Sequence, residues 1–134
     1  MRAGREVLVP EAVRAALEQL LGERITQVKV IEHSWIARLH PRARATTRRS
    51  RIYLRDSARE FFADPSLMLH EYCHVIRQWQ TGRLTVLRYV RAWLRHGYRN
   101  NPFEIEARAF ADANAGRLSA LLSATTHPSS ASRR

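Results

Sequence analysis

DPSLMLHEYCHVIRQWQTG, residues 64–82, is the stretch from which the fold of this 134-residue chain can be worked out. Asp64 is a residue type that caps helix N-termini, and Pro65 is favoured at the first helical position. Gly82 ends the pattern, because glycine commonly follows the last turn of a helix. The stretch therefore predicts one helix that runs from Pro65 to Gln80.

Two histidines four residues apart in the middle of this helix form a candidate metal site. His70 and His74 share one face, with Cβ atoms about 5–6 Å apart, so their imidazoles can take two corners of a tetrahedral zinc site. Glu71 lies about 100° around the helix from His70. From that direction it reaches a water on the metal rather than the metal itself. This is the geometry of the H-E-x-x-H pattern, which has two ligands and a general base.

A catalytic zinc usually takes a third protein ligand. The extended pattern with a third histidine fails, because Arg77 and Gln80 stand at its glycine and histidine positions. The later stretch NPFEIEAR, residues 101–108, begins with a helix-capping signature and offers two carboxylates, Glu104 and Glu106. Either of them can supply the missing ligand.

Spacing favours Glu104 as the third ligand and leaves Glu106 as the alternative. Ala107 and Ala111 fall on the helix face of Glu104, where small residues let two helices approach closely. Glu106 also has two alanines on its own side. Glu104 stands three residues after Asn101, so a capping box is a second interpretation of that glutamate.

The remaining pattern predicts an α+β fold: an N-terminal helix, a small antiparallel sheet, the HExxH helix and two further helices. We expect one zincin-like metallopeptidase domain over residues 1–122 and a disordered, Ser-rich tail over residues 123–134. The predicted elements are a helix between Pro10 and Gly22, strands at residues 25–32 and 49–55, the helix of residues 65–80, and helices near residues 84–96 and 101–122.

Composition limits the partners that the chain can have. The formal net charge is +11 and the basic residues are spread along the chain, with the tightest cluster at residues 42–51. Such a surface attracts anions in general, so nucleic-acid binding is expected only through general basic charge. The single cysteine, Cys73, excludes a disulfide within the chain and is expected to pack in the core rather than to bind metal.

The N-terminal stretch lacks an apolar signal-peptide core, and the sequence has no run of about 18 apolar residues. We therefore expect a cytoplasmic protein with no membrane partner, while secretion as the cargo of an assembly stays open.

The segments ATTRRSRIYLR (45–55), LMLHEYCHVIRQWQTG (67–82) and GYRNNPFEIEAR (97–108) together resemble the short gluzincin metallopeptidases. The chain looks most similar to the core metallopeptidase-like domain of bacterial extracellular contractile injection systems. The resemblance implies bound Zn²⁺ with His70, His74 and Glu104 as ligands and Glu71 as general base. It also implies a strand beside the site that pairs with an extended substrate; here that strand would comprise Arg51, Ile52, Tyr53, Leu54 and Arg55.

The leading hypothesis is a zinc-dependent metallopeptidase that hydrolyses peptide bonds with a metal-activated water. Because two arginines of the expected substrate strand share a face with Tyr53, we expect some preference for acidic peptides. One departure from the gluzincin pattern is Arg108, which stands where many members place an aspartate that orients a ligand histidine. The alternatives are a catalytically silent, zinc-stabilised interaction module in a larger bacterial assembly and, less favoured, a basic nucleic-acid-binding domain.

Overall fold

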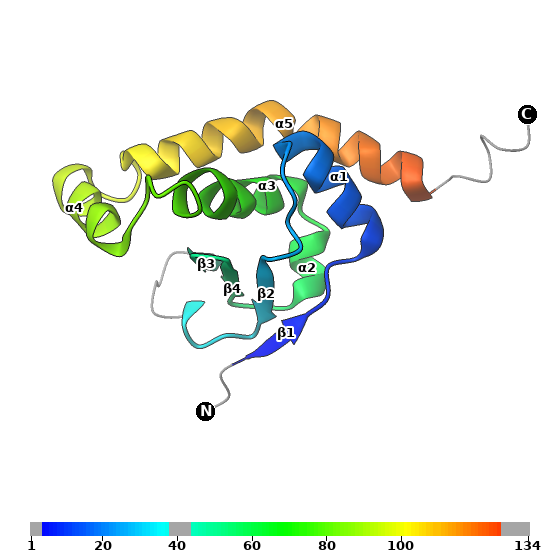
Figure 1. The fold of residues 1–134 in the computed structure, drawn as a ribbon, viewed down its shortest axis with the longest axis horizontal. Coiled ribbons are helices and arrows are strands. Elements are labelled where there is room, and N and C mark those ends of the chain that lie inside the picture. Colours follow the sequence, from blue (N-terminus) through cyan, green and yellow to red (C-terminus); the bar gives the residue numbers. More distant parts are fainter. Residues whose placement is uncertain (1–3, 38–43, 127–134) are drawn as a thin grey trace, which may run out of the picture.

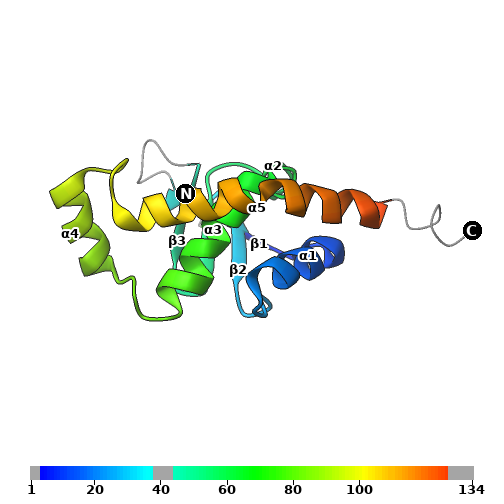
Figure 2. The ribbon, with the colours of Figure 1, turned by 90° about the horizontal axis from the view of Figure 1, so that it is seen from above.

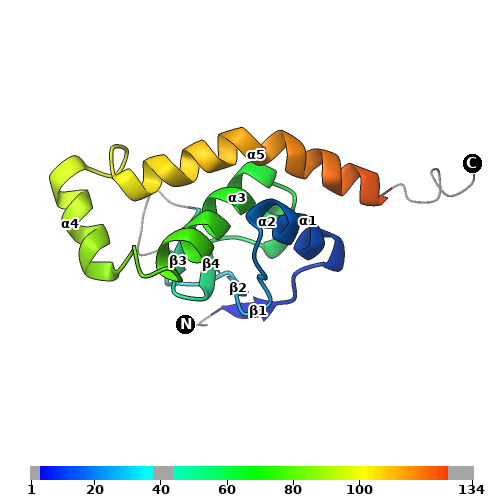
Figure 3. The ribbon, with the colours of Figure 1, turned by 45° about the horizontal axis from the view of Figure 1, so that its top comes forward.

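A small sheet on one side and a layer of helices on the other make up the fold in this computed structural model, which describes residues 4–37 and 44–126 (Figure 1). The α+β class expected from the sequence is confirmed. Helix α3 lies between the sheet and the long helix α5 (Figures 1 and 3). In chain order the elements are β1 (Arg5–Val7), α1 (Glu11–Leu21), β2 (Lys29–Glu32), β3 (Ala45–Arg48), β4 (Arg51–Leu54), α2 (Ala58–Phe62), α3 (Pro65–Cys73), the π-helical segment η2 (His74–Trp79), α4 (Val86–His96) and α5 (Pro102–Thr126).

The sheet has the strand order β1-β2-β4-β3. The outer pairs β1–β2 and β3–β4 are antiparallel, as expected. The central pair β2–β4 is parallel, which corrects the prediction of a purely antiparallel sheet. The reason is the path of the chain: it leaves β2, forms the outer strand β3 first, and turns back so that β4 enters beside β2 in the same direction.

Three short elements are not among those predicted. They are β1, β3 and α2, each of three to five residues. Strand β3, with the sequence ATTR, lies inside the arginine-rich cluster and lacks the large apolar residues that mark a strand. At the other end of the chain α5 continues to Thr126, so residues 123–126 are helical rather than tail, and the rest of the predicted tail lies outside the described residues.

The hydrophobic core lies between the sheet, α1, α3 and α5. Helix α1 buries its apolar stripe and ends at Gly22, whose φ of 72° suits a residue without a Cβ. The larger side chains that are fully enclosed include Leu17, Ile25, Ile52, Phe61, Met68, Leu69, Tyr72 and Leu118. Among the parts of the chain that the structure describes, no helix is both long enough and apolar enough to cross a membrane.

The predicted helix of residues 65–80 is confirmed, with one change in its last turns. Asp64 caps it by accepting a hydrogen bond of 3.0 Å from the N–H of Leu67. After Cys73 the helix widens into the π-helical segment η2, in which the N–H of Gln80 donates to the carbonyl of Val75. Such wide turns occur often at functional sites.

Candidate metal centre

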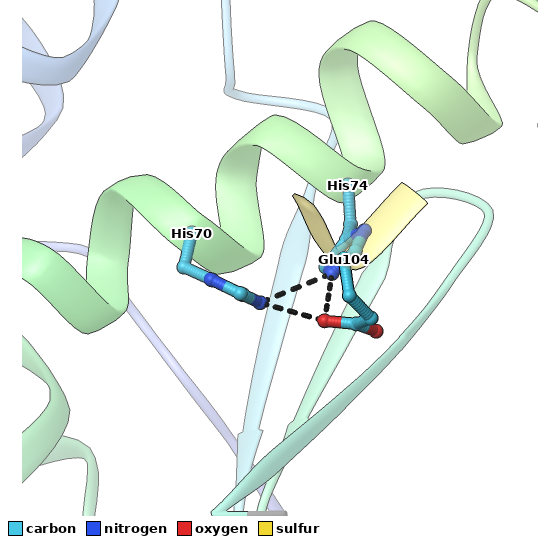
Figure 4. Close-up of side chains that lie close together, drawn as sticks. All are labelled: His70, His74 and Glu104. Carbon is cyan, nitrogen blue, oxygen red and sulfur yellow. Dashed lines mark hydrogen bonds and ion pairs between the residues drawn. The ribbon is translucent and has the colours of Figure 1, made fainter. Parts of the chain in front are cut away.

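Three side chains from α3, η2 and α5 converge on one point (Figure 4). Nε2 of His70 lies 2.9 Å from Oε1 of Glu104, and Nε2 of His74 lies 3.2 Å from the same oxygen. The two Nε2 atoms are 3.2 Å apart. His74 and Glu104 are buried and His70 is partly buried. The structure thus brings together the three residues that the sequence analysis favoured as ligands.

Close packing of α3 against α5 places Glu104 opposite the histidines. Ala107 and Ala111 are buried on the face of α5 that carries Glu104, and they let the two helices approach. The alternative ligand Glu106 lies on another face and pairs with Arg83, at 3.0 Å. Glu106 therefore does not join the cluster.

The capping-box interpretation of Glu104 does not describe the structure. Asn101 does cap α5, since its Oδ1 accepts a 2.9 Å hydrogen bond from the N–H of Phe103. The N–H of Asn101, however, donates to the carbonyl of Tyr98. The carboxylate of Glu104 points to the histidines and also accepts a 2.9 Å hydrogen bond from the hydroxyl of Tyr89.

A glutamine that the sequence analysis did not assign fixes the orientation of His74. The amide nitrogen of Gln78 donates to the carbonyl of Phe103 at 2.9 Å and to Oε1 of Glu106 at 2.7 Å. These two acceptors determine which end of the amide is oxygen, so Oε1 of Gln78 accepts from Nδ1 of His74 at 2.6 Å. With its proton on Nδ1, the imidazole keeps the Nε2 lone pair free for a metal.

The donor set matches zinc. Zinc takes imidazole nitrogen and carboxylate oxygen at about 2.0–2.2 Å in tetrahedral geometry, which separates neighbouring ligand atoms by roughly 3.3 Å. The three separations of 2.9, 3.2 and 3.2 Å are close to this value. Three protein ligands also leave the fourth corner open, as catalytic zinc sites do.

The charges of the three side chains are strongly coupled. Burial alone would raise the pKa of the Glu104 carboxyl, but hydrogen bonds from both histidines outweigh burial and lower it well below its usual range. Burial likewise disfavours charge on His74, yet the Glu104 carboxylate raises the pKa of this imidazole to about 9. A cation placed among these groups would replace the proton that His74 otherwise holds.

Glu71 lines the same cleft as His74 and Glu104, which is where a general base beside the cluster must lie. Its side chain is buried, and this burial raises its pKa, while the nearby histidines act in the opposite direction. A carboxylate with a raised pKa takes up a proton more readily near neutral pH.

The cleft has a volume of about 220 Å³ and opens between β3 and α4. Glu71, His74 and Glu104 line its floor, together with Tyr89 and Tyr98. The two tyrosines are therefore close enough to the cluster to donate hydrogen bonds there, and nothing in the sequence alone assigns them this position. Further lining comes from Ala45, Thr46, Thr47 and Arg48 of β3, Val86 and Val90 of α4, and Ile36, Trp79 and Leu84.

The expected substrate strand is not at the edge of the sheet. Strand β4 pairs with β2 on one side and with β3 on the other, so Ile52, Tyr53 and Leu54 have no free edge to offer. Their side chains are buried, and none of them lines the cleft. Arg51 also pairs within β3–β4, and the N–H of Arg55 donates to the carbonyl of Arg44. Among the strands of the described residues, the one at the sheet edge beside the cleft is β3.

Cys73 packs in the core, as expected. It is fully buried, and burial raises the pKa of its thiol to about 12. It is not part of the cluster of potential ligands found in the described residues.

A family model named eCIS core domain matches residues 8–82, which is more than half of the chain. The chain belongs to the eCIS core domain family. The matched region of this eCIS core domain contains His70, Glu71 and His74, whereas Glu104 and both cleft tyrosines lie beyond it. No curated protein and no solved structure matches the chain.

Proposed function

We propose that this eCIS core domain is a zinc-dependent metallopeptidase that acts as a component of a contractile injection system. The observation that carries the proposal is the convergence of His70, His74 and Glu104 beside a cleft that the buried carboxylate of Glu71 also lines. The family match supports the link to the injection system, and the donor set supports zinc.

Bound zinc would supply a Lewis acid and lower the pKa of a water molecule toward about 7. In the proposed reaction Glu71 is the base that would accept a proton from the attacking water and pass it to the amine that leaves. Tyr89 and Tyr98 are the phenol groups that line the cleft, and the hydroxyl of either could donate to the oxygen of the scissile carbonyl. Gln78 holds the His74 ring in the tautomer that binds metal.

The substrate in this proposal is an extended peptide that adds to the free edge of β3, because backbone pairing to an exposed strand is a common mode of peptide binding. The expected preference for acidic peptides is then assigned to Arg48, which lines the cleft, rather than to Arg51 on β4 or to Arg55 just after it.

A second candidate is a zinc-stabilised module without turnover. Two observations favour it. Arg108, at the position where many gluzincins carry an aspartate, donates to the carbonyl of Arg99 and supports no ligand. Within residues 4–37 and 44–126, no hydrogen bond reaches Nδ1 of His70, so this ligand is less firmly oriented than His74.

Metal content and peptide cleavage, measured on the same preparations, test both candidates. The purified protein is compared with Glu71→Gln, His70→Ala and, as a matched control, Glu60→Gln at an exposed site on α2. We expect one zinc per chain and cleavage of a peptide library, detected by mass spectrometry. Glu71→Gln should keep the zinc and lose activity by about 10²- to 10⁴-fold, whereas His70→Ala should lose zinc.

The outcomes separate the candidates. Zinc with no cleavage of any peptide would favour the silent module. Absence of zinc from the unmutated protein, after loading with a stoichiometric amount, would contradict both candidates.

A further inference from the structure

Helix α4 has an apolar face that the rest of the molecule does not cover. None of its residues is buried, and it makes only slight contact with the other helices and strands. In all three ribbon views α4 lies at one end of the molecule, away from α1 and α2 (Figures 1, 2 and 3). Its exposed large apolar side chains are Val86, Leu87, Val90, Trp93 and Leu94, of which Leu87 and Leu94 are 77% and 76% exposed.

The opposite face of α4 is basic. At 100° per residue, Leu87, Val90 and Leu94 fall within about 60° of one another, while Arg88 and Arg95 fall roughly 120° away. The sequence VLRYVRAWLRH thus separates apolar from cationic residues along its whole length. A core-facing helix would bury such an apolar stripe, and α4 exposes it.

The charge around α4 has one sign. Between Glu71 and Glu104 the chain contains no aspartate or glutamate, and it contains six arginines. Arg91 and Arg95 form no ion pair within the described part of the chain. A partner for this surface must therefore combine an apolar layer with negative charge.

We propose that α4 binds the surface of an anionic lipid bilayer. The helix would lie in the plane of the interface, with Leu87, Trp93 and Leu94 at the boundary of the acyl chains and its arginines among the headgroups. Helices that bind in this way have an apolar face with Leu or Trp, an Arg-rich polar face and low net hydrophobicity. The expectation that no membrane partner exists rested on the lack of a spanning segment, and a helix that lies on the surface needs none.

The same observations argue against a second copy of the chain as the occupant. Two α4 helices that met through their apolar faces would bring two arginine-rich, acid-free segments together, and like charges at close range repel. An anionic bilayer offers acyl chains to the apolar face of α4 and negatively charged headgroups to its arginines. Because Val86, Tyr89 and Val90 also line the cleft, membrane binding would place the candidate metal centre next to the lipid surface.

Vesicle co-sedimentation tests the proposal on the full chain. Vesicles of phosphatidylglycerol and phosphatidylcholine are compared with vesicles of phosphatidylcholine alone. The variant Leu87→Ser/Leu94→Ser removes the exposed leucines. The matched control, Leu8→Ser/Ile105→Ser, removes two exposed apolar side chains elsewhere. All four positions are exposed, so both variants should stay folded, which circular dichroism checks.

We expect binding to the anionic vesicles only. The affinity for these vesicles should fall roughly tenfold for each leucine removed, because each leucine side chain would be buried in the bilayer. The control should bind like the unmutated protein. The tryptophan emission should shift to shorter wavelength on binding, and Trp93→Phe should abolish most of that shift.

Three results would overturn the proposal. The first is no binding to anionic vesicles at low salt. The second is equal binding by the leucine variant and its control, which would mean that general positive charge alone accounts for the binding. The third is self-association that depends on the leucines, seen by analytical ultracentrifugation without vesicle binding, which would assign the face to a second copy.

Discussion

Replacement of Gln78 by methionine should weaken zinc binding although Gln78 is not a ligand. Methionine has a similar length and cannot accept the proton of Nδ1 on His74, which now lies 2.6 Å from the glutamine oxygen. Without this acceptor the ring can rotate and can carry its proton on Nε2, where the metal would bind. Loss of such a supporting hydrogen bond typically lowers metal affinity about 10- to 100-fold, equivalent to roughly 1.4–2.7 kcal/mol.

The assay is a competition titration with a chromophoric zinc chelator at fixed pH. Gln80→Met is the matched control: Gln80 accepts a hydrogen bond from Gln27 on the surface and has no contact with the cluster. Gln78→Met also leaves the carbonyl of Phe103 without its side-chain donor, so thermal unfolding of the metal-free proteins must be compared. The reasoning is refuted if folded Gln78→Met binds zinc within threefold of the control.

Two further predictions concern the fold itself. Glu32 accepts a 2.8 Å hydrogen bond from the N–H of Ala58, which with Arg5 lowers the pKa of its carboxyl. Its contribution to stability is therefore present above the usual pKa of a glutamate and is lost as the pH falls through the lowered value. Glu32→Gln should lower the free energy of unfolding by about 1 kcal/mol at pH 7 and by less below pH ~4. Urea unfolding at several pH values measures this difference. Leu17→Ala should lower the free energy of unfolding by about 2–5 kcal/mol because Leu17 is fully buried. Leu8→Ala, at an exposed site, should lower it by less than about 0.5 kcal/mol. Equal midpoints of denaturation for the two variants would contradict the placement of the core.

The sequence predicts the features of this molecule that depend on local hydrogen bonds and helical spacing. Asp64-Pro65 and Asn101-Pro102 mark the starts of α3 and α5, because capping depends on local hydrogen bonds that a short motif encodes. The choice of Glu104 over Glu106 also follows from local periodicity, since the alanines beside Glu104 lie on the buried face of its helix.

What the sequence does not predict depends on non-local pairing. Polar and apolar residues alternate in β4, a pattern that does not tell an edge strand from an inner one, and β3 covers one side of β4. The four residues of β3 carry too little apolar surface to predict a strand. Gln78 resembles any polar residue near the end of a helix. Its role requires the π-helical turn and the carbonyl of Phe103, which is 25 residues away.

The position of the three candidate ligands along the chain affects more than their chemistry. His74 and Glu104 are 30 residues apart, and the segment between them contains all of α4. A metal ion held at both ends would close this segment into a loop, much as a cross-link does, and chain entropy for a loop of that length corresponds to about 3–4 kcal/mol. This entropy is removed from the unfolded chain, so the metal would stabilise the fold as a whole, including the segment of α4 that has little packing of its own. Removal of the metal would therefore lower the free energy of unfolding although no side chain is changed.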